Sequence, residues 1–129
     1  RGEVVDGQAL LHSGLRWVLD VWEHEPDLDA ELLGRALIAT PHIAGYSEQG
    51  KANATSLAVA AVSRHFRLPL TGWYPPEVTP TTPRPISWEE LCRTIDAHYD
   101  IEAESLRLKQ HPDRFESLRD HYAYRPEYF

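Results

Sequence analysis

The sequence is organised around the stretch Leu37-Ile38-Ala39-Thr40-Pro41-His42-Ile43-Ala44-Gly45-Tyr46-Ser47. Its first three residues form an apolar run that is typical of a short strand. A histidine then stands between a proline, which restricts the residue before it, and a glycine, which permits backbone conformations that other residues resist. The final serine can cap a helix. The stretch therefore predicts a strand, a loop that fixes the direction of an imidazole, and the start of a helix.

Upstream of this stretch, short apolar runs alternate with short helical segments. The mostly apolar residues 15–21 suit a buried strand of a parallel sheet. Helices are expected at 8–12, behind Asp6, which can cap that helix, and at 29–36. Such alternation is typical of an α/β domain, in which ligands bind beyond the carboxyl ends of the strands. Residues 20–25 and 40–46 both fall at such ends, so we expect functional side chains there.

A single long helix is expected from Ser47 to Phe66. Apolar residues recur along it at three- and four-residue spacing: Ala54, Leu57, Ala58, Ala61, Val62 and Phe66. Val59 and Ala60 widen this stripe well beyond one face of the helix. We therefore expect the helix to be buried between domains or subunits.

A linker at 67–85 carries most of the ten prolines of the chain and predicts a domain boundary. Beyond it, Ser87 opens a capping box and a helix that continues through about His98. A further helix is expected at 112–122, and residues 100–109 are left open between strand and helix. The predicted organisation divides the chain into 1–47, 48–66, 67–85 and 86–129.

Composition narrows the class of protein without naming a function. The chain has 129 residues, of which 42% are hydrophobic and 26% charged, as in a globular protein. Its net charge of -7 argues against nucleic acid as a main partner, because such proteins concentrate Lys and Arg. No apolar run approaches the roughly 18 residues of a membrane span, so no membrane partner is expected. Cys92 is the single cysteine, which precludes an internal disulfide and favours a reducing cytoplasm.

Polar residues at the expected strand ends suggest acid–base chemistry on an anionic substrate. Arg1 supplies a fixed cation, His42 an imidazole, and either Glu23 or Glu25 a carboxylate; spacing alone does not choose between the two glutamates. Asp20 also ends an apolar run, where an unpaired carboxylate would be costly to bury. The other histidines are too scattered along the chain to suggest a metal site.

Three segments, in this order, closely resemble the D-2-hydroxyacid dehydrogenases: Arg1-Gly2 to Asp6, Leu19 to Pro26, and Thr40 to Gly45. The similarity covers roughly the first 66 residues. By position, it implies that Arg1 binds the substrate and serves catalysis. It also implies that Glu25, rather than Glu23, is the partner carboxylate of His42, the acid/base.

The same resemblance implies a cofactor and a fold. Arg1, Asp20 and Gly45 would lie beside the nicotinamide of NAD, and Tyr46 would contact the substrate. Residues 1–47 would be the C-terminal part of a Rossmann-type NAD-binding domain. The helix at 48–66 would cross back to the substrate domain, within an α/β architecture completed by a small α+β domain.

Further features are similar to one member of this family, which acts on a small phosphorylated 2-hydroxy acid. They are Trp22, the run from His42 to Ser47, and Gly50-Lys51-Ala52. The pattern from Tyr99 to Tyr122 resembles the additional C-terminal dimerisation domain of that member, so a homodimer is implied. A second possibility is another dehydrogenase of the family, acting on phosphoglycerate or glyoxylate. A third is a non-catalytic dimerising module, like the transcriptional corepressors related to these enzymes.

The sequence departs from the family pattern in two respects. The segment between Asp6 and Trp17 is several residues shorter than usual. No Gly-x-Gly-x-x-Gly phosphate loop occurs in the chain, and in the family this loop lies upstream of the position of Arg1. We therefore expect the chain to be part of a dehydrogenase and to be inactive alone. The intact set of Arg1, Glu25 and His42 weighs against the non-catalytic reading.

Overall fold

The computed structural model describes residues 4–82 and 84–127, which combine helices with a small parallel sheet. The α/β class expected from the sequence is therefore confirmed. The chain packs as two compact units. The described residues up to Ala44 pack with Tyr99–Tyr122, and Gly45–His98 pack with 123–127. The boundaries predicted at 47, 66 and 85 stay a prediction.

The first unit begins with two helix–strand pairs: α1 (Gly7–His12), β1 (Val18–Leu19), α2 (Ala30–Arg35) and β2 (Ile38–Ala39). Both helices start where the sequence predicts them. The Asp6 carboxylate accepts a hydrogen bond from the Ala9 amide at 2.9 Å, and Asp29 caps Leu32 in the same way at 2.8 Å. The caps thus fix where each short helix begins.

The two strands are parallel, as the sequence predicts, but only two residues of each strand are paired. Val18 lies opposite Ile38, and Leu19 lies opposite Ala39. The expected strand at 15–21 is therefore longer than the observed one. Val18 is 58% exposed, because in the described part of the chain β1 has a neighbouring strand on one side only.

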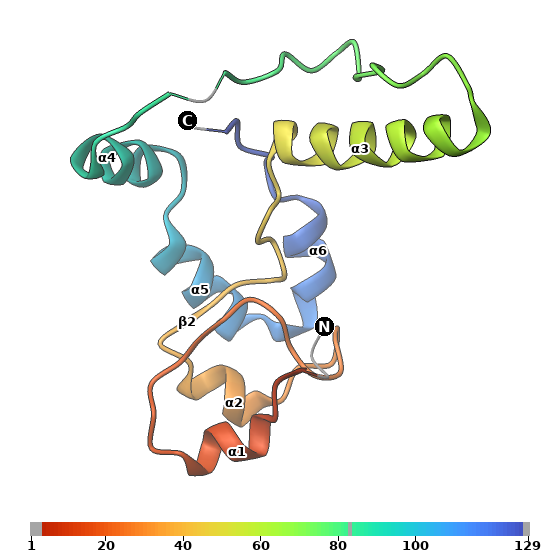
Figure 1. Cartoon of the computed structure of the whole chain (residues 1–129). Coiled ribbons are helices and arrows are strands. Elements are labelled where there is room, and N and C mark those ends of the chain that lie inside the picture. The colour runs from red at the N-terminus through yellow and green to blue at the C-terminus, as the bar shows by residue number, and fades with distance from the viewer. Residues whose placement is uncertain (1–3, 83, 128–129) are drawn as a thin grey trace. The chain divides into compact units, whose positions relative to one another are not determined.

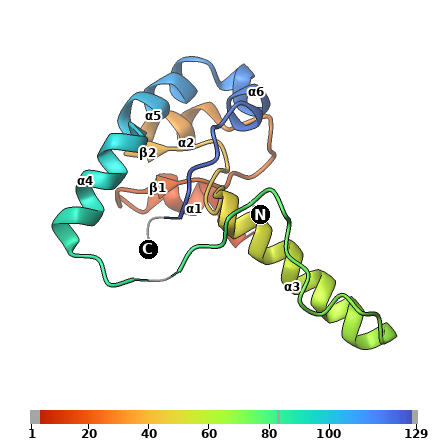
Figure 2. The same ribbon diagram turned by 90° about the horizontal axis from the view of Figure 1, so that it is seen from above.

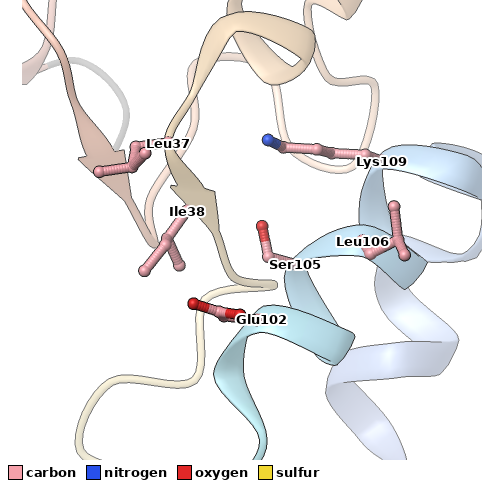
Figure 3. A pocket seen from close by; sticks show the side chains of 6 residues that line it. All are labelled: Leu37, Ile38, Glu102, Ser105, Leu106 and Lys109. Carbon is pink, nitrogen blue, oxygen red and sulfur yellow. The ribbon is translucent and has the colours of Figure 1, made fainter.

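Helix α5 (Ile101–Gln110) resolves the segment that the sequence left open, and it lies beside β2 in both views (Figures 1 and 2). The Ser105 hydroxyl accepts a hydrogen bond from the Ala39 amide at 2.9 Å. The Lys109 ammonium donates to the carbonyl of Ala36. Figure 3 shows both side chains reaching from α5 toward the strand. The helix thus occupies the edge of β2 that faces away from β1.

One buried core holds the first unit together. It contains Leu11, Trp17, Trp22, Leu32, Leu33, Ala36, Ala39, Leu108 and Phe115. Phe115 begins α6 (Phe115–Asp120), which follows a short 3-10 turn, η2 (Pro112–Arg114). The described part of 86–129 is helical, and its strand content is limited to an isolated bridge between Ser47 and Arg125.

The second unit is built on the long helix α3 (Glu48–Phe66), which begins and ends close to the predicted residues. Its buried face is lined by small and polar residues, including Ala60 and Ser63. The chain then returns along this face (Figures 1 and 2), where the Ser63 hydroxyl accepts from the Leu70 amide at 3.1 Å. Helix α4 (Trp88–His98) follows, with Ser87 capping the Glu90 amide at 3.1 Å.

The apolar stripe expected on α3 lies on its exposed side. Leu57 is 71% exposed, Val62 51% and Phe66 65%. Ala60, by contrast, is only 9% exposed, on the side that the returning chain covers. The expected burial of the stripe between domains or subunits stays a prediction. Across the described residues, no helix has both the length and the apolar character that a membrane span requires.

Candidate active site

The candidate site is centred on an imidazole–carboxylate pair at the ends of the two strands. His42 lies in the loop after β2, and Glu25 lies in the turn after β1. Nδ1 of His42 is 2.8 Å from Oε2 of Glu25, and the side chains are 30% and 18% exposed. Because an ionised carboxylate only accepts hydrogen bonds, Nδ1 carries the proton. The other ring nitrogen, Nε2, has no partner among the described residues.

Both members of the pair are held by the surrounding backbone. Oε1 of Glu25 accepts the Trp22 amide at 2.8 Å. The Trp22 indole, 2% exposed, donates to the Thr40 carbonyl at 3.0 Å. His42 has a φ of 57°, a left-handed conformation that is uncommon outside glycine and is retained only where its surroundings impose it. The loop therefore presents the imidazole in a fixed direction, as the proline and glycine around it predict.

Asp20 anchors the loop that carries His42. Its Oδ1 accepts from the Thr40 hydroxyl at 2.7 Å and from the Ile43 amide at 2.8 Å. Its Oδ2 accepts from the Ala44 amide at 3.0 Å. The carboxylate at the end of β1 thus accepts three hydrogen bonds from nearby residues, and this explains how it is tolerated there. A role beside a cofactor stays a prediction.

Glu23 and Glu25, which spacing could not separate, have different partners. Oε2 of Glu23 accepts the Gly7 amide at 3.1 Å, at the start of α1. A Cβ at Gly7 would lie only 2.7 Å from this oxygen, so a side chain there would displace the Glu23 carboxylate. Glu23 is therefore committed to the amino end of a helix, and Glu25 is the carboxylate that meets His42.

The remaining predicted site residues are divided between the second unit and the undescribed N-terminus. Arg1 lies outside the described residues. Gly45 has a φ of 82°, and a Cβ built on it would meet no atom within 4 Å. The Tyr46 ring contacts Tyr124 edge to face, with centroids 5.5 Å apart, and Lys51 Nζ lies 3.8 Å from its centroid.

Sequence reasoning did not identify Trp22 and Thr40 as supports of the site. A tryptophan between a strand end and a glutamate was a usable signal, because a buried indole N–H must find an acceptor. No sequence signal indicated that its acceptor would be Thr40, eighteen positions further on. Within 4–82 and 84–127, no group of three or more His, Cys, Asp or Glu side chains is arranged to hold a metal ion.

An imidazole oriented by a carboxylate beyond the ends of parallel strands is suited to proton transfer in an α/β enzyme. The class expected from the motifs, a dehydrogenase, is also that of the curated proteins to which the chain is similar. These are erythronate-4-phosphate dehydrogenases. That of Bacteroides fragilis is 46% identical over 98% of the chain, and that of Bacteroides thetaiotaomicron is 43% identical over 98%. That of Cellvibrio japonicus is 36% identical over 99%. None of the protein-family models compared with the chain matches it.

The chain is therefore homologous to part of the erythronate-4-phosphate dehydrogenases, as its motifs indicate. It spans 37% of the length of the two Bacteroides proteins and 40% of the Cellvibrio protein. The similarity extends past the dehydrogenase motifs into the C-terminal region, since it covers nearly the whole chain.

Proposed function

We propose that this chain is part of an enzyme that uses NAD to oxidise 4-phospho-D-erythronate to (R)-3-hydroxy-2-oxo-4-phosphobutanoate, a step in the biosynthesis of pyridoxal 5'-phosphate (vitamin B6). The observation that carries the proposal is the His42–Glu25 pair, 2.8 Å apart, in a chain 46% identical to an erythronate-4-phosphate dehydrogenase. A non-catalytic descendant would have no reason to keep both side chains in this orientation.

His42 is the acid/base of the proposed reaction. Glu25 holds Nδ1 and so leaves Nε2 directed at the substrate hydroxyl. In the oxidative direction Nε2 removes the hydroxyl proton while the C2–H bond breaks; in the reverse direction it returns that proton to the oxygen. NAD, when bound, supplies the acceptor for the hydride from C2.

Asp20 and Gly45 each have a feature that supports the proposed binding of a nicotinamide. Oδ2 of Asp20 accepts one hydrogen bond from the Ala44 amide, which leaves it capacity for a carboxamide N–H. Within the second unit, no atom lies within 4 Å of the place where a Cβ of Gly45 would stand, so a planar ring can approach the backbone there. Arg1 would complete this part of the site.

Arg1 and Tyr46 would bind the two ends of the substrate. A guanidinium can form two parallel charge-assisted hydrogen bonds with the C1 carboxylate, which places C2 beside the acid/base. Tyr46 would contact the phosphate end of the same molecule. Because Arg1 would bind the carboxylate and Tyr46 the phosphate end, the site would select a short acid that carries a phosphate.

The sheet and the helices suggest how the rest of the enzyme is attached. Because α5 blocks the outer edge of β2 through Ser105, further strands of a Rossmann-type sheet can add only beside β1. The exposed stripe on α3, with the region 86–129, would form the contact of a homodimer.

Steady-state kinetics of the full-length protein with NAD test the proposal. We expect 4-phospho-D-erythronate to give a higher kcat/KM than 3-phosphoglycerate or D-lactate. A comparable kcat/KM for phosphoglycerate would instead indicate another D-2-hydroxyacid dehydrogenase. Absence of turnover with all three acids would favour a non-catalytic dimerising module.

A further inference from the structure

We propose that the C-terminal segment 124–127 is a positioning element for the substrate-binding residue Tyr46. This inference rests on the proposed function, because it assigns a task to the contacts around a residue that the proposal places against substrate. The contacts all lie within the second unit. They join the end of the described chain to the first turn of α3.

Backbone hydrogen bonds tie the segment to the start of α3. Arg125 forms an isolated parallel bridge with Ser47, and its carbonyl accepts the Glu48 amide at 3.0 Å. The Glu127 amide donates to Oε1 of Gln49 at 2.8 Å. Amides in the first turn of a helix have no partner inside the helix. The segment therefore supplies an acceptor that α3 cannot provide for itself.

A carboxylate reinforces this attachment. The Ser47 side chain, fully buried, donates its hydroxyl proton to Glu127 and accepts the Gly50 amide at 3.0 Å. One serine thus links the cap of α3 to the C-terminal segment. A Cβ at Gly50 would collide with the Ser47 hydroxyl and lie 3.3 Å from Oε1 of Glu127. The negative charge also lies near the positive end of the helix dipole.

The aromatic contacts carry the effect to Tyr46. The rings of Tyr46 and Tyr124 meet at 87° with centroids 5.5 Å apart. Lys51 Nζ lies 3.8 Å from the Tyr46 centroid and 5.4 Å from the Tyr124 centroid, so both rings face the same cation. Such contacts restrict the ring directly and do not require its hydroxyl.

Enzyme kinetics of Tyr124→Leu and Tyr124→Phe in the full-length protein test whether Tyr124 positions Tyr46 or only stabilises the fold. Tyr124→Leu removes the ring contacts, and we expect KM for 4-phospho-D-erythronate to rise roughly three- to ten-fold, the worth of one aromatic pair. We expect kcat to stay within about two-fold, because the His42–Glu25 pair is untouched. Tyr124→Phe keeps the ring and should restore KM.

Amide hydrogen exchange provides a readout that does not depend on activity. Glu127→Gln should accelerate exchange at Glu48 and Gly50, whereas Glu116→Gln, the same change on an exposed side chain of α6, should not. Faster exchange together with an unchanged KM in Tyr124→Leu would mean that the segment only stabilises α3, and the positioning role would be wrong. Unchanged exchange and unchanged KM would also overturn it. An inactive wild-type protein would contradict the proposed function, while the exchange rates would still report on the contacts.

Discussion

At the scale of single residues, the proposed chemistry depends on His42. We expect His42→Ala to lower kcat by roughly two to four orders of magnitude, the usual contribution of a positioned acid/base. Glu25→Gln should lower kcat less, because the imidazole remains while its orientation and charge balance weaken. Steady-state kinetics of the full-length protein would measure both effects.

Glu23→Gln is the matched control for this prediction. Glu23 carries the same side chain as Glu25, two positions away, but accepts the Gly7 amide rather than meeting His42. It should therefore leave kcat nearly unchanged. If Glu23→Gln proved as damaging as Glu25→Gln, the assignment of the partner carboxylate would be wrong.

A second residue-scale prediction concerns the buried hydroxyl of Tyr99. It has no hydrogen-bond partner in the described part of the chain, and burial, with a smaller contribution from the charge of Glu104, raises its pKa well above that of an exposed tyrosine. The protonated Tyr99 hydroxyl gives its full contribution to the stability of the folded protein below the unfolded-state pKa of about 10. This contribution is lost as pH rises from there through the higher folded-state pKa. The free energy of unfolding should therefore fall above about pH 10.

Urea unfolding of Tyr99→Phe at pH 7 and above pH 10 tests this expectation. Tyr99→Phe removes a hydroxyl that makes no bond, so the free energy of unfolding at pH 7 should change little. Its decline in alkali should be shallower than in the wild type. Tyr124→Phe, at a tyrosine that is 48% exposed, is the control and should keep the wild-type decline. Equal declines in all three proteins would show that Tyr99 does not contribute.

At the scale of elements, the loop between β2 and α3 depends on Asp20. Asp20→Ala removes the acceptor for Thr40, Ile43 and Ala44 at once. We expect it to lower the free energy of unfolding by about 2–4 kcal/mol, since hydrogen bonds to charged groups contribute about 1.5–3 kcal/mol each and part of the loop becomes accessible to water. Amide exchange at Ile43 and Ala44 should accelerate. Asp20→Asn keeps one oxygen acceptor and should be intermediate; an unaffected loop in Asp20→Ala would show that proline and glycine suffice.

At the scale of the whole molecule, we expect self-association through the exposed stripe of α3. Leu57, 71% exposed, lies within this stripe, and Leu57→Glu should weaken or abolish the dimer of the full-length protein. Gln8→Glu adds the same charge at an exposed position of α1, outside this stripe, and should leave the dimer intact. Sedimentation velocity would distinguish the two. A tight dimer in Leu57→Glu would place the contact elsewhere.

The local elements and the residue types of the site can be predicted from the sequence. The starts of α1, α2 and α3 follow from Asp6, Asp29 and Ser47, because a cap acts on amides two or three residues away. The run 40–45 likewise predicts the loop from its proline and glycine, and an acid–base site from its histidine. Homology to dehydrogenases was likewise readable from short motifs in their order along the chain.

Contacts between groups far apart in the sequence follow from the tertiary structure. In the structure Glu25 meets His42 and Glu23 meets Gly7, a difference that spacing along the chain leaves open and that the sequence indicates only through its resemblance to the dehydrogenases. The tertiary structure also placed Ser105 at the edge of β2, 66 positions from Ala39, and joined 124–127 to the start of α3. Such pairings depend on how buried surfaces pack and on which unpaired amides remain for a distant oxygen to satisfy. Composition and periodicity describe only the local backbone, so they indicate neither how buried surfaces pack nor which amides remain unpaired.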